Sequence, residues 1–165
     1  MIVNFKKLRE NAIIPTWGHD DDSNAGMDFY ACLPENCDTV IMPNGSANIT
    51  TGVAWEPPLF DPTITMFDAH NYDSEHWKPA MIIKGRSGLS IKHGLEECNA
   101  GVIDSGYRGE IMLRLYNHGN EPYTIHHGDR IAQGIVVMLP VVTIREVNTL
   151  GESTRGTNGF GSSGK

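Results

Sequence analysis

The run GVIDSGYRGE at residues 101–110 brings one carboxylate and one phenol together between glycines. The carboxylate of Asp104 could orient and deprotonate a water molecule, because a fixed carboxylate is an effective general base. The glycine-rich backbone exposes N–H and C=O groups that could bind the edge of a planar ligand, with Tyr107 beside it. An ordinary hairpin with a solvated Asp is the alternative, and this run alone leaves both interpretations open.

The segments on either side of this run must position it, and both are predicted to be strands. Val102 and Ile103 lead into Asp104, and an alternating segment follows Gly109. A period of two is typical of a strand with one buried face. The apolar face is Ile111, Leu113 and Leu115, and the opposite face is Met112, Arg114 and Tyr116.

The rest of the chain predicts an all-β jelly-roll-like sandwich or barrel with one short helix. Eighteen glycines and nine prolines separate short apolar runs, and long helical periodicity is absent, which favours many short strands. The helix is expected from Ser87, as its N-cap, to about Gly94. Residues 135–142 are apolar on both faces, so we expect them to be buried in the core or at a subunit contact.

Length and composition indicate the domain organisation and exclude some classes of function. A length of 165 residues suits one domain, expected over residues 1–150, with a mobile glycine- and serine-rich arm at 151–165. A net charge of −7 argues against a nucleic-acid partner. No apolar run has the ~20 residues that cross a bilayer, so no membrane association is expected. Three cysteines cannot all pair within one chain, which favours a reducing, cytoplasmic location, or a host-cell interior for a viral protein.

Four further motifs accompany the run at 101–110. They are AGMDFYA at 25–31, GRSGLS at 85–90, RIAQ at 130–133 and RGTNGFGSSG at 155–164. In this order the five motifs closely resemble those of the trimeric dUTPase family, and the resemblance runs from about Asn24 to Gly164. It implies hydrolysis of dUTP to dUMP and pyrophosphate by a homotrimer.

The resemblance also implies roles for individual residues. Asp104 would activate water for attack on the α-phosphate. Asp28 would lie near Mg²⁺, through a coordinated water, with the ion held mainly by substrate phosphates, since Mg²⁺ keeps several waters. The remaining candidates would bind substrate: Arg86, Ser87, Gly88 and Gln133 on the phosphates; Gly101, Val102, Ile103 and Tyr107 on the base and sugar; and Arg155, Phe160, Gly161 and Ser162 from the closing arm. Arg130 is expected instead to pair with an acid at a subunit contact.

One departure from the family and two alternative functions remain open. Residues 56–78 resemble an insertion, as in some viral members, and its aromatic residues could bind a protein partner. A longer hairpin or Ω-loop is the alternative. A related dCTP deaminase would need a glutamate base, for which Glu96, Glu97 and Glu110 are available. A nucleotide-gated regulatory protein that uses the insertion is the other alternative.

Overall fold

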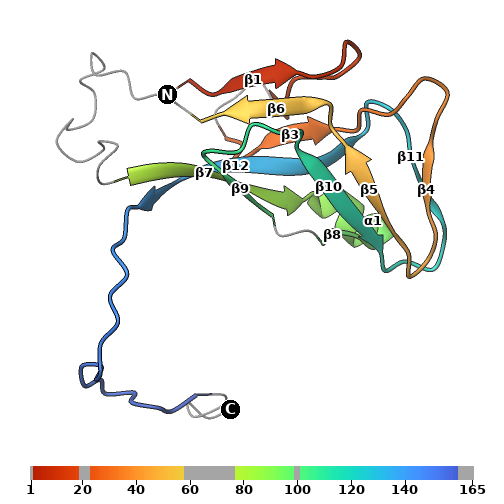
Figure 1. Ribbon diagram of the computed structural model, residues 1–165. Helices are drawn as coiled ribbons and strands as arrows, with labels where there is room; N and C mark the ends of the chain where they lie inside the picture. Colours follow the sequence, from red (N-terminus) through yellow and green to blue (C-terminus); the bar gives the residue numbers. More distant parts are fainter. Residues whose placement is uncertain (1, 19–22, 58–76, 99–100, 160–165) are drawn as a thin grey trace.

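Short strands make up most of the computed structural model, which describes residues 2–18, 23–57, 77–98 and 101–159. In these ranges the strands form a jelly-roll-like sandwich that does not close into a barrel (Figure 1). The larger sheet has the order β2 (Thr16–Trp17), β3 (Met27–Tyr30), β12 (Arg130–Pro140), β7 (Trp77–Gly85), β9 (Val102–Asp104). The smaller sheet has the order β5 (Ser46–Thr50), β10 (Met112–Asn117), β8 (Leu95–Glu97).

Two ribbons and one helix complete the described part of the sandwich. The ribbons pair β1 (Asn4–Lys7) with β6 (Val53–Glu56), and β4 (Thr39–Ile41) with β11 (Tyr123–Ile125). The helix α1 (Ser87–His93) connects β7 to β8. Across the described ranges, no helix is both long and apolar enough to cross a membrane. The prediction of an all-β fold with one short helix is confirmed, because the described residues form strands and one short helix.

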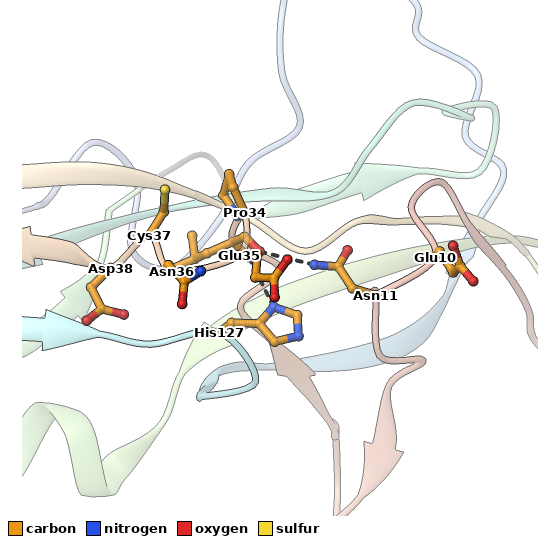
Figure 2. Close-up of a pocket in the computed structure, with 9 residues that line it drawn as sticks. Glu10, Asn11, Pro34, Glu35, Asn36, Cys37, Asp38 and His127 are labelled. Carbon is orange, nitrogen blue, oxygen red and sulfur yellow. Dashed lines mark hydrogen bonds between the residues drawn. The ribbon is translucent and has the colours of Figure 1, made fainter.

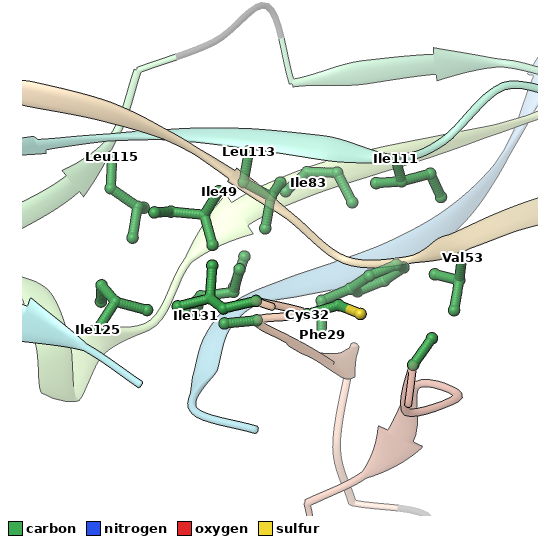
Figure 3. Close-up of a cluster of buried hydrophobic side chains, with 14 of the residues drawn as sticks. Phe29, Cys32, Ile49, Val53, Ile83, Ile111, Leu113, Leu115, Ile125 and Ile131 are labelled. Carbon is green, nitrogen blue, oxygen red and sulfur yellow. The ribbon is translucent and has the colours of Figure 1, made fainter. Parts of the chain in front are cut away.

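The core lies between the two sheets and follows the predicted alternation of β10. Leu113 is fully buried and Leu115 is almost so, whereas Met112, the first residue of β10, is 51% exposed. In Figure 3 the side chains of Leu113 and Leu115 point into a cluster that also holds Phe29 and Ile131. Burial of such side chains supplies ~1.5–3 kcal/mol each, so this alternation fixes the register of β10.

The helix starts differently from the prediction. Arg86 occupies the N-cap with an extended backbone (φ −84°, ψ 133°) and makes no side-chain capping bond, so Ser87 is the first helical residue and not the cap. The reason is that β7 continues to Gly85 and carries its extended backbone into Arg86. The predicted end is confirmed, because Gly94 adopts φ +68° and its N–H reaches Ser90 O at 2.9 Å.

The apolar stretch 135–142 is not buried on both faces within one subunit, contrary to a core position. Residues 135–138 are half-buried, and the chain is exposed from Leu139 onward. After Pro140 the segment 141–159 is exposed throughout and runs away from the sandwich, in blue (Figure 1). Of the two interpretations of this stretch, the core is excluded by its exposure, and a subunit contact remains.

Most of the segment interpreted as an insertion, 58–76, lies outside the described residues. Strand β6 ends at Glu56 and β7 begins at Trp77, so the interval connects two strands that are consecutive along the chain. Its role as a partner site stays a prediction.

Candidate active site

A buried carboxylate lies at the centre of one half of the predicted site. Asp28 is 1% exposed in β3. Register with β12 places it opposite Gln133, and Arg86 follows the end of β7. A charge so buried needs compensating partners, because desolvation of an unpaired carboxylate is costly. We call Asp28, Arg86, Arg130 and Gln133 the Asp28 cluster.

Both carboxylate oxygens of Asp28 are occupied within this cluster. Arg86 Nε lies 3.2 Å from Oδ1, and Arg130 Nη1 donates to Oδ2 at 3.1 Å. Gln133 Nε2 donates to Oδ1 at 3.4 Å. Arg86 Nη1 also donates to the carbonyl of Arg130 at 3.2 Å, which joins the two arginines directly.

The guanidinium groups keep donors for a ligand. The side chains of Arg86 and Arg130 are 26% and 46% exposed, respectively, while that of Asp28 is 2% exposed. A guanidinium has five N–H donors, and the contacts above use only some of them. The cluster therefore presents fixed positive charge, suited to binding phosphate.

The start of α1 adjoins Arg86 and adds backbone donors. The first N–H groups of a helix have no intrahelical partner, and here these belong to Ser87 and Gly88. A Cβ added at Gly88 would meet no heavy atom within 4 Å, so the space beside it is open. The structure thus brings together Arg86, Ser87, Gly88 and Gln133, the residues expected on the phosphates.

The run at 101–110 forms the other half of the predicted site. It is not a hairpin, because β9 pairs with β7 in the larger sheet whereas β10 pairs with β5 and β8 in the smaller one, so the run connects the two sheets. We call residues 101–110 the glycine turn. Gly101 adopts φ +70°, and its carbonyl accepts a hydrogen bond from Ile83 N at 2.6 Å. Asp104 ends β9 on the exposed surface, and its carbonyl accepts a bond from Tyr107 N at 3.1 Å. Among the described residues, the carboxylate of Asp104 has no hydrogen-bond or ion-pair partner, so it is free to bind water.

Asp104 and Arg86, one from each half, lie far apart within one subunit. Asp104 of β9 lies opposite Ala80 of β7, whereas Arg86 follows the end of β7, six residues after Ala80. At ~3.3 Å per strand residue, their backbones are separated by roughly 20 Å. Adjacent phosphorus atoms of a triphosphate are joined by a single oxygen. A ligand with its α-phosphate at Asp104 therefore cannot place its β-phosphate on Arg86 of the same subunit.

The arm contributes one described candidate. Arg155 lies in the exposed segment 141–159, where its Nε donates to Asn158 O at 2.8 Å in a local turn. Within this subunit it is not brought to the other candidates. Phe160, Gly161 and Ser162 lie outside the described residues.

The donor set limits how a metal could be held. In the described ranges, no group of three or more His, Cys, Asp or Glu side chains could bind a metal ion. The two oxygens of Asp28 already accept bonds from Arg86, Arg130 and Gln133. These residues do not form a protein cage for Mg²⁺, and no reaction step is derived through one. A place for Asp28 near the ion stays a prediction.

The sequence interpretation missed two features of this region. Arg130 pairs with Asp28 of its own subunit, although it was expected at a subunit contact. Glu110, the last residue of the glycine turn, contacts Arg9 through both carboxylate oxygens. The only sequence signal for this second pair was a glutamate beside Gly109. Its partner lies 101 positions away.

A hollow of about 530 Å³ lies away from all of these candidates (Figure 2). It is lined by residues 10–11, 33–38 and His127. Two of its polar contacts are internal: Leu33 N donates to His127 Nδ1 at 3.2 Å, and Asn11 Nδ2 donates to Leu33 O at 3.1 Å. None of the predicted site residues lines it, so it is not the candidate active site.

A jelly-roll-like sandwich with a cationic cluster around Asp28 and an exposed carboxylate on the glycine turn is suited to binding an anionic ligand and activating water beside it. Comparison with known proteins gives the family. The dUTPase family model matches residues 56–164, and the chain belongs to the dUTPase family. It is 38% identical over 164 residues to the deoxyuridine 5′-triphosphate nucleotidohydrolase of Clostridium tetani, covering 99% of this chain and 97% of the relative.

Further relatives support the same assignment. The enzyme of that name from Solibacter usitatus is 36% identical over 167 residues, covering 100% of this chain and 97% of the relative. The dUTPase of Staphylococcus bacteriophage 80alpha, solved with dUpNHpp, superposes with a TM-score of 0.76 at 25% identity, covering 99% of each chain. A dUTPase variant from phage phi11 of S. aureus, described with a structural Mg(II) ion, has a TM-score of 0.70 at 21% identity, covering 92% of this chain and 100% of that chain, and it supports the fold alone.

Proposed function

We propose that this protein is a dUTP diphosphatase that hydrolyses dUTP to dUMP and pyrophosphate. Family membership supports the reaction, and the curated relatives carry its name over nearly the whole chain. The observation that carries the proposal is the Asp104 carboxylate, which is exposed at the end of β9 and without a partner among the described residues. A carboxylate held by a strand, yet not neutralised by a neighbour, suits a general base.

In the proposed mechanism, Asp104 accepts a proton from a water molecule. The oxygen of that water forms a bond to the α-phosphorus. The bond from this phosphorus to the oxygen bridging to the β-phosphate breaks, and pyrophosphate leaves with that oxygen. Arg86, the first N–H groups of α1 and Gln133 bind the departing phosphates and stabilise their charge. Mg²⁺ bound to the phosphate oxygens would neutralise further charge.

In the proposed site, the glycine turn would select the base. Uracil presents an acceptor, a donor and an acceptor along its pairing edge, which backbone groups around Gly101, Val102 and Ile103 could complement. Cytosine would oppose donor to donor and acceptor to acceptor, at ~1–3 kcal/mol for each buried mismatch. Tyr107 beneath the sugar would exclude a 2′-hydroxyl and so favour deoxyribose.

The distance between Asp104 and Arg86 supports a site shared between subunits, in a homotrimer. Asp104 of one subunit would act with Arg86 of a neighbour, because roughly 20 Å separates the two residues within one chain. The half-buried apolar side chains at 135–138 offer a surface for that contact. The exposed segment 141–159 would carry Arg155 to a site on another subunit.

The test is pyrophosphate release from dUTP with Mg²⁺, with dCTP, dTTP and UTP measured in parallel. Release from dUTP alone is expected, and no release from dUTP would overturn the proposal. Ammonia together with dUMP from dCTP would indicate the deaminase alternative instead.

A further inference from the structure

Glu110, the last residue of the glycine turn, is held by contacts from two other segments. Both of its carboxylate oxygens accept hydrogen bonds from Arg9 Nη2, at 2.5 and 2.6 Å. Its Oε1 also accepts one from the backbone N–H of Gly52 at 2.7 Å. The side chains of Arg9 and Glu110 are 37% and 21% exposed, so the pair is only partly screened by water.

Arg9 is itself fixed by the body of the sandwich. Its Nη1 donates to the carbonyl of Cys32 at 2.9 Å and to Thr50 Oγ1 at 3.1 Å. Thr50 ends β5, and its hydroxyl donates to the same Cys32 carbonyl at 2.7 Å. The guanidinium therefore links Glu110 to backbone that the core holds in place, because Cys32 is 1% exposed.

The backbone of Glu110 in turn fixes Tyr107. Its carbonyl accepts a hydrogen bond from the Tyr107 hydroxyl at 2.9 Å. The ring lies close over Gly109, where an added Cβ would be 2.5 Å from that hydroxyl oxygen. Tyr107 is 43% exposed, and among the described residues its hydroxyl has no hydrogen-bond partner other than this carbonyl. Its position depends on the position of the Glu110 carbonyl.

We propose that Arg9 and Glu110 are positioning residues for sugar selection. They hold the Glu110 carbonyl where the Tyr107 hydroxyl can bond to it, and so keep the ring fixed against the sugar. Arg9 acts only through Glu110 and Tyr107. The inference rests on the proposed function, in which Tyr107 excludes a 2′-hydroxyl. It is separate from the Asp28 cluster and from the Asp104 chemistry.

The experiment measures the ratio of kcat/KM for dUTP to that for UTP in Arg9→Gln and Glu110→Gln. The expected result is a fall of about fivefold to tenfold in this ratio, the effect of one lost hydrogen bond on the selecting residue. Arg9→Lys, which keeps the charge, should restore part of the ratio. Thermal unfolding of each variant shows that it is folded.

Arg114→Gln is the matched control. Arg114 lies in β10 of the smaller sheet, and its guanidinium donates to Ser46 Oγ, at 3.2 and 2.9 Å, and not to the glycine turn. Its ratio should equal that of the wild type. A role in stability alone would lower the unfolding temperature of the Arg9 and Glu110 variants and leave their selectivity at the wild-type value.

A double-mutant cycle tests the route through Tyr107. Tyr107→Phe removes the hydroxyl and should lower the dUTP/UTP ratio by itself. Adding Arg9→Gln to it should then change the ratio no further, because the link is already broken. An unchanged ratio in both single variants, or full additivity in the cycle, would overturn the proposal.

Equilibrium binding keeps this inference distinct from the proposed reaction. The ratio of Kd for UMP to that for dUMP is measured by calorimetry in the same variants and requires no turnover. Absence of dUTP hydrolysis in the wild type would overturn the proposed function. A Kd ratio that is the same in the wild type and in Arg9→Gln would overturn the positioning role.

Discussion

Asp28 Oδ2 accepts a hydrogen bond from Arg130 Nη1 at 3.1 Å, although the two residues lie 102 positions apart. Pairing of β3 with β12 brings them together, and Arg86 shares the same carboxylate. One buried negative charge thus holds two guanidinium groups before any phosphate arrives. Such preorganisation lowers the reorganisation needed when an anion binds.

Asp28→Asn should weaken phosphate binding more than it changes the reaction at bound substrate. The amide cannot balance two guanidinium groups, so Arg86 and Arg130 lose their fixed positions. We expect a higher KM for dUTP and a free energy of unfolding lower by about 1–3 kcal/mol, since both arginines can still reach solvent. Steady-state kinetics and urea unfolding measure the two effects. Asp38→Asn, at an exposed carboxylate, is the control for KM.

That control should leave KM unchanged. If Asp28→Asn also left KM unchanged, the cluster would not bind the phosphates.

Subunit complementation tests the separation of Asp104 from Arg86. Asp104→Asn and Arg86→Ala are each expected to lose activity by about 10²-fold or more, through the base and the phosphate contact respectively. In trimers refolded from an equal mixture, about a quarter of the sites would combine an intact Asp104 with an intact Arg86 from different subunits. Activity near that fraction is expected.

A mixture no more active than its components would place both residues in the site of one subunit, contrary to the geometry of β7 and β9. Mixing each variant with itself under the same refolding conditions controls for recovery.

Arg155→Ala should lower dUTP turnover without changing stability. Its guanidinium contacts only Asn158 within the described part of the arm, so its loss removes no contact with the sandwich. Arg145→Ala is the matched control, because Arg145 lies on the same exposed segment. We expect kcat/KM to fall in the first variant and to stay at the wild-type value in the second. Equal kinetics in both would argue against an arm that delivers Arg155.

The sequence predicts some of these features well because their physical signal is local. The alternation of Ile111, Leu113 and Leu115 gave the buried face of β10, since a strand turns successive side chains to opposite faces. Gly94 gave the helix end, since a left-handed residue there favours glycine. The first prediction needed only a period of two, and the second needed only a residue type.

Other features depend on pairing between distant segments. Ser87 was expected as a cap, but the length of β7 decides where the helix begins, and that length follows from pairing with β12. Likewise, nothing local to Glu110 points to Arg9. The exposure of residues 139–142 also depends on which other segments of the chain pack against them, and a local pattern cannot show this. These relationships required the folded chain.

His126 makes a pH-dependent contact with Asp38, which lines the hollow in Figure 2. Its Nδ1 lies 2.9 Å from Asp38 Oδ1. The hydrogen bond to Asp38 raises the pKa of His126 above 6.5, with further contributions from the charges of Asp38 and Asp129. Because the pKa of His126 is higher in the folded state than in the unfolded state, protonation of His126 stabilises the fold. This stabilisation is complete at a pH below the unfolded-state pKa and is lost as the pH rises through the folded-state pKa.

Asp38→Asn should therefore lower the urea midpoint at pH 5.5 and leave it nearly unchanged at pH 8.5. Titration of the His126 ring by NMR should show its pKa falling in the variant. A difference in urea midpoint that is constant between the two pH values would show that the pair does not act through protonation of His126.

Gly134→Ala should destabilise the fold, because β12 passes too close to the core for a side chain there. An added Cβ would lie 2.4 Å from Phe29 Cε2 and 3.0 Å from Met81 Sδ, and both of those residues are fully buried. Overpacking of this kind costs ~1–3 kcal/mol. Gly151→Ala, where no heavy atom lies within 4 Å, is the control. Urea unfolding should show a lower midpoint only for the first variant, whereas equal midpoints would mean that the ring of Phe29 can move aside.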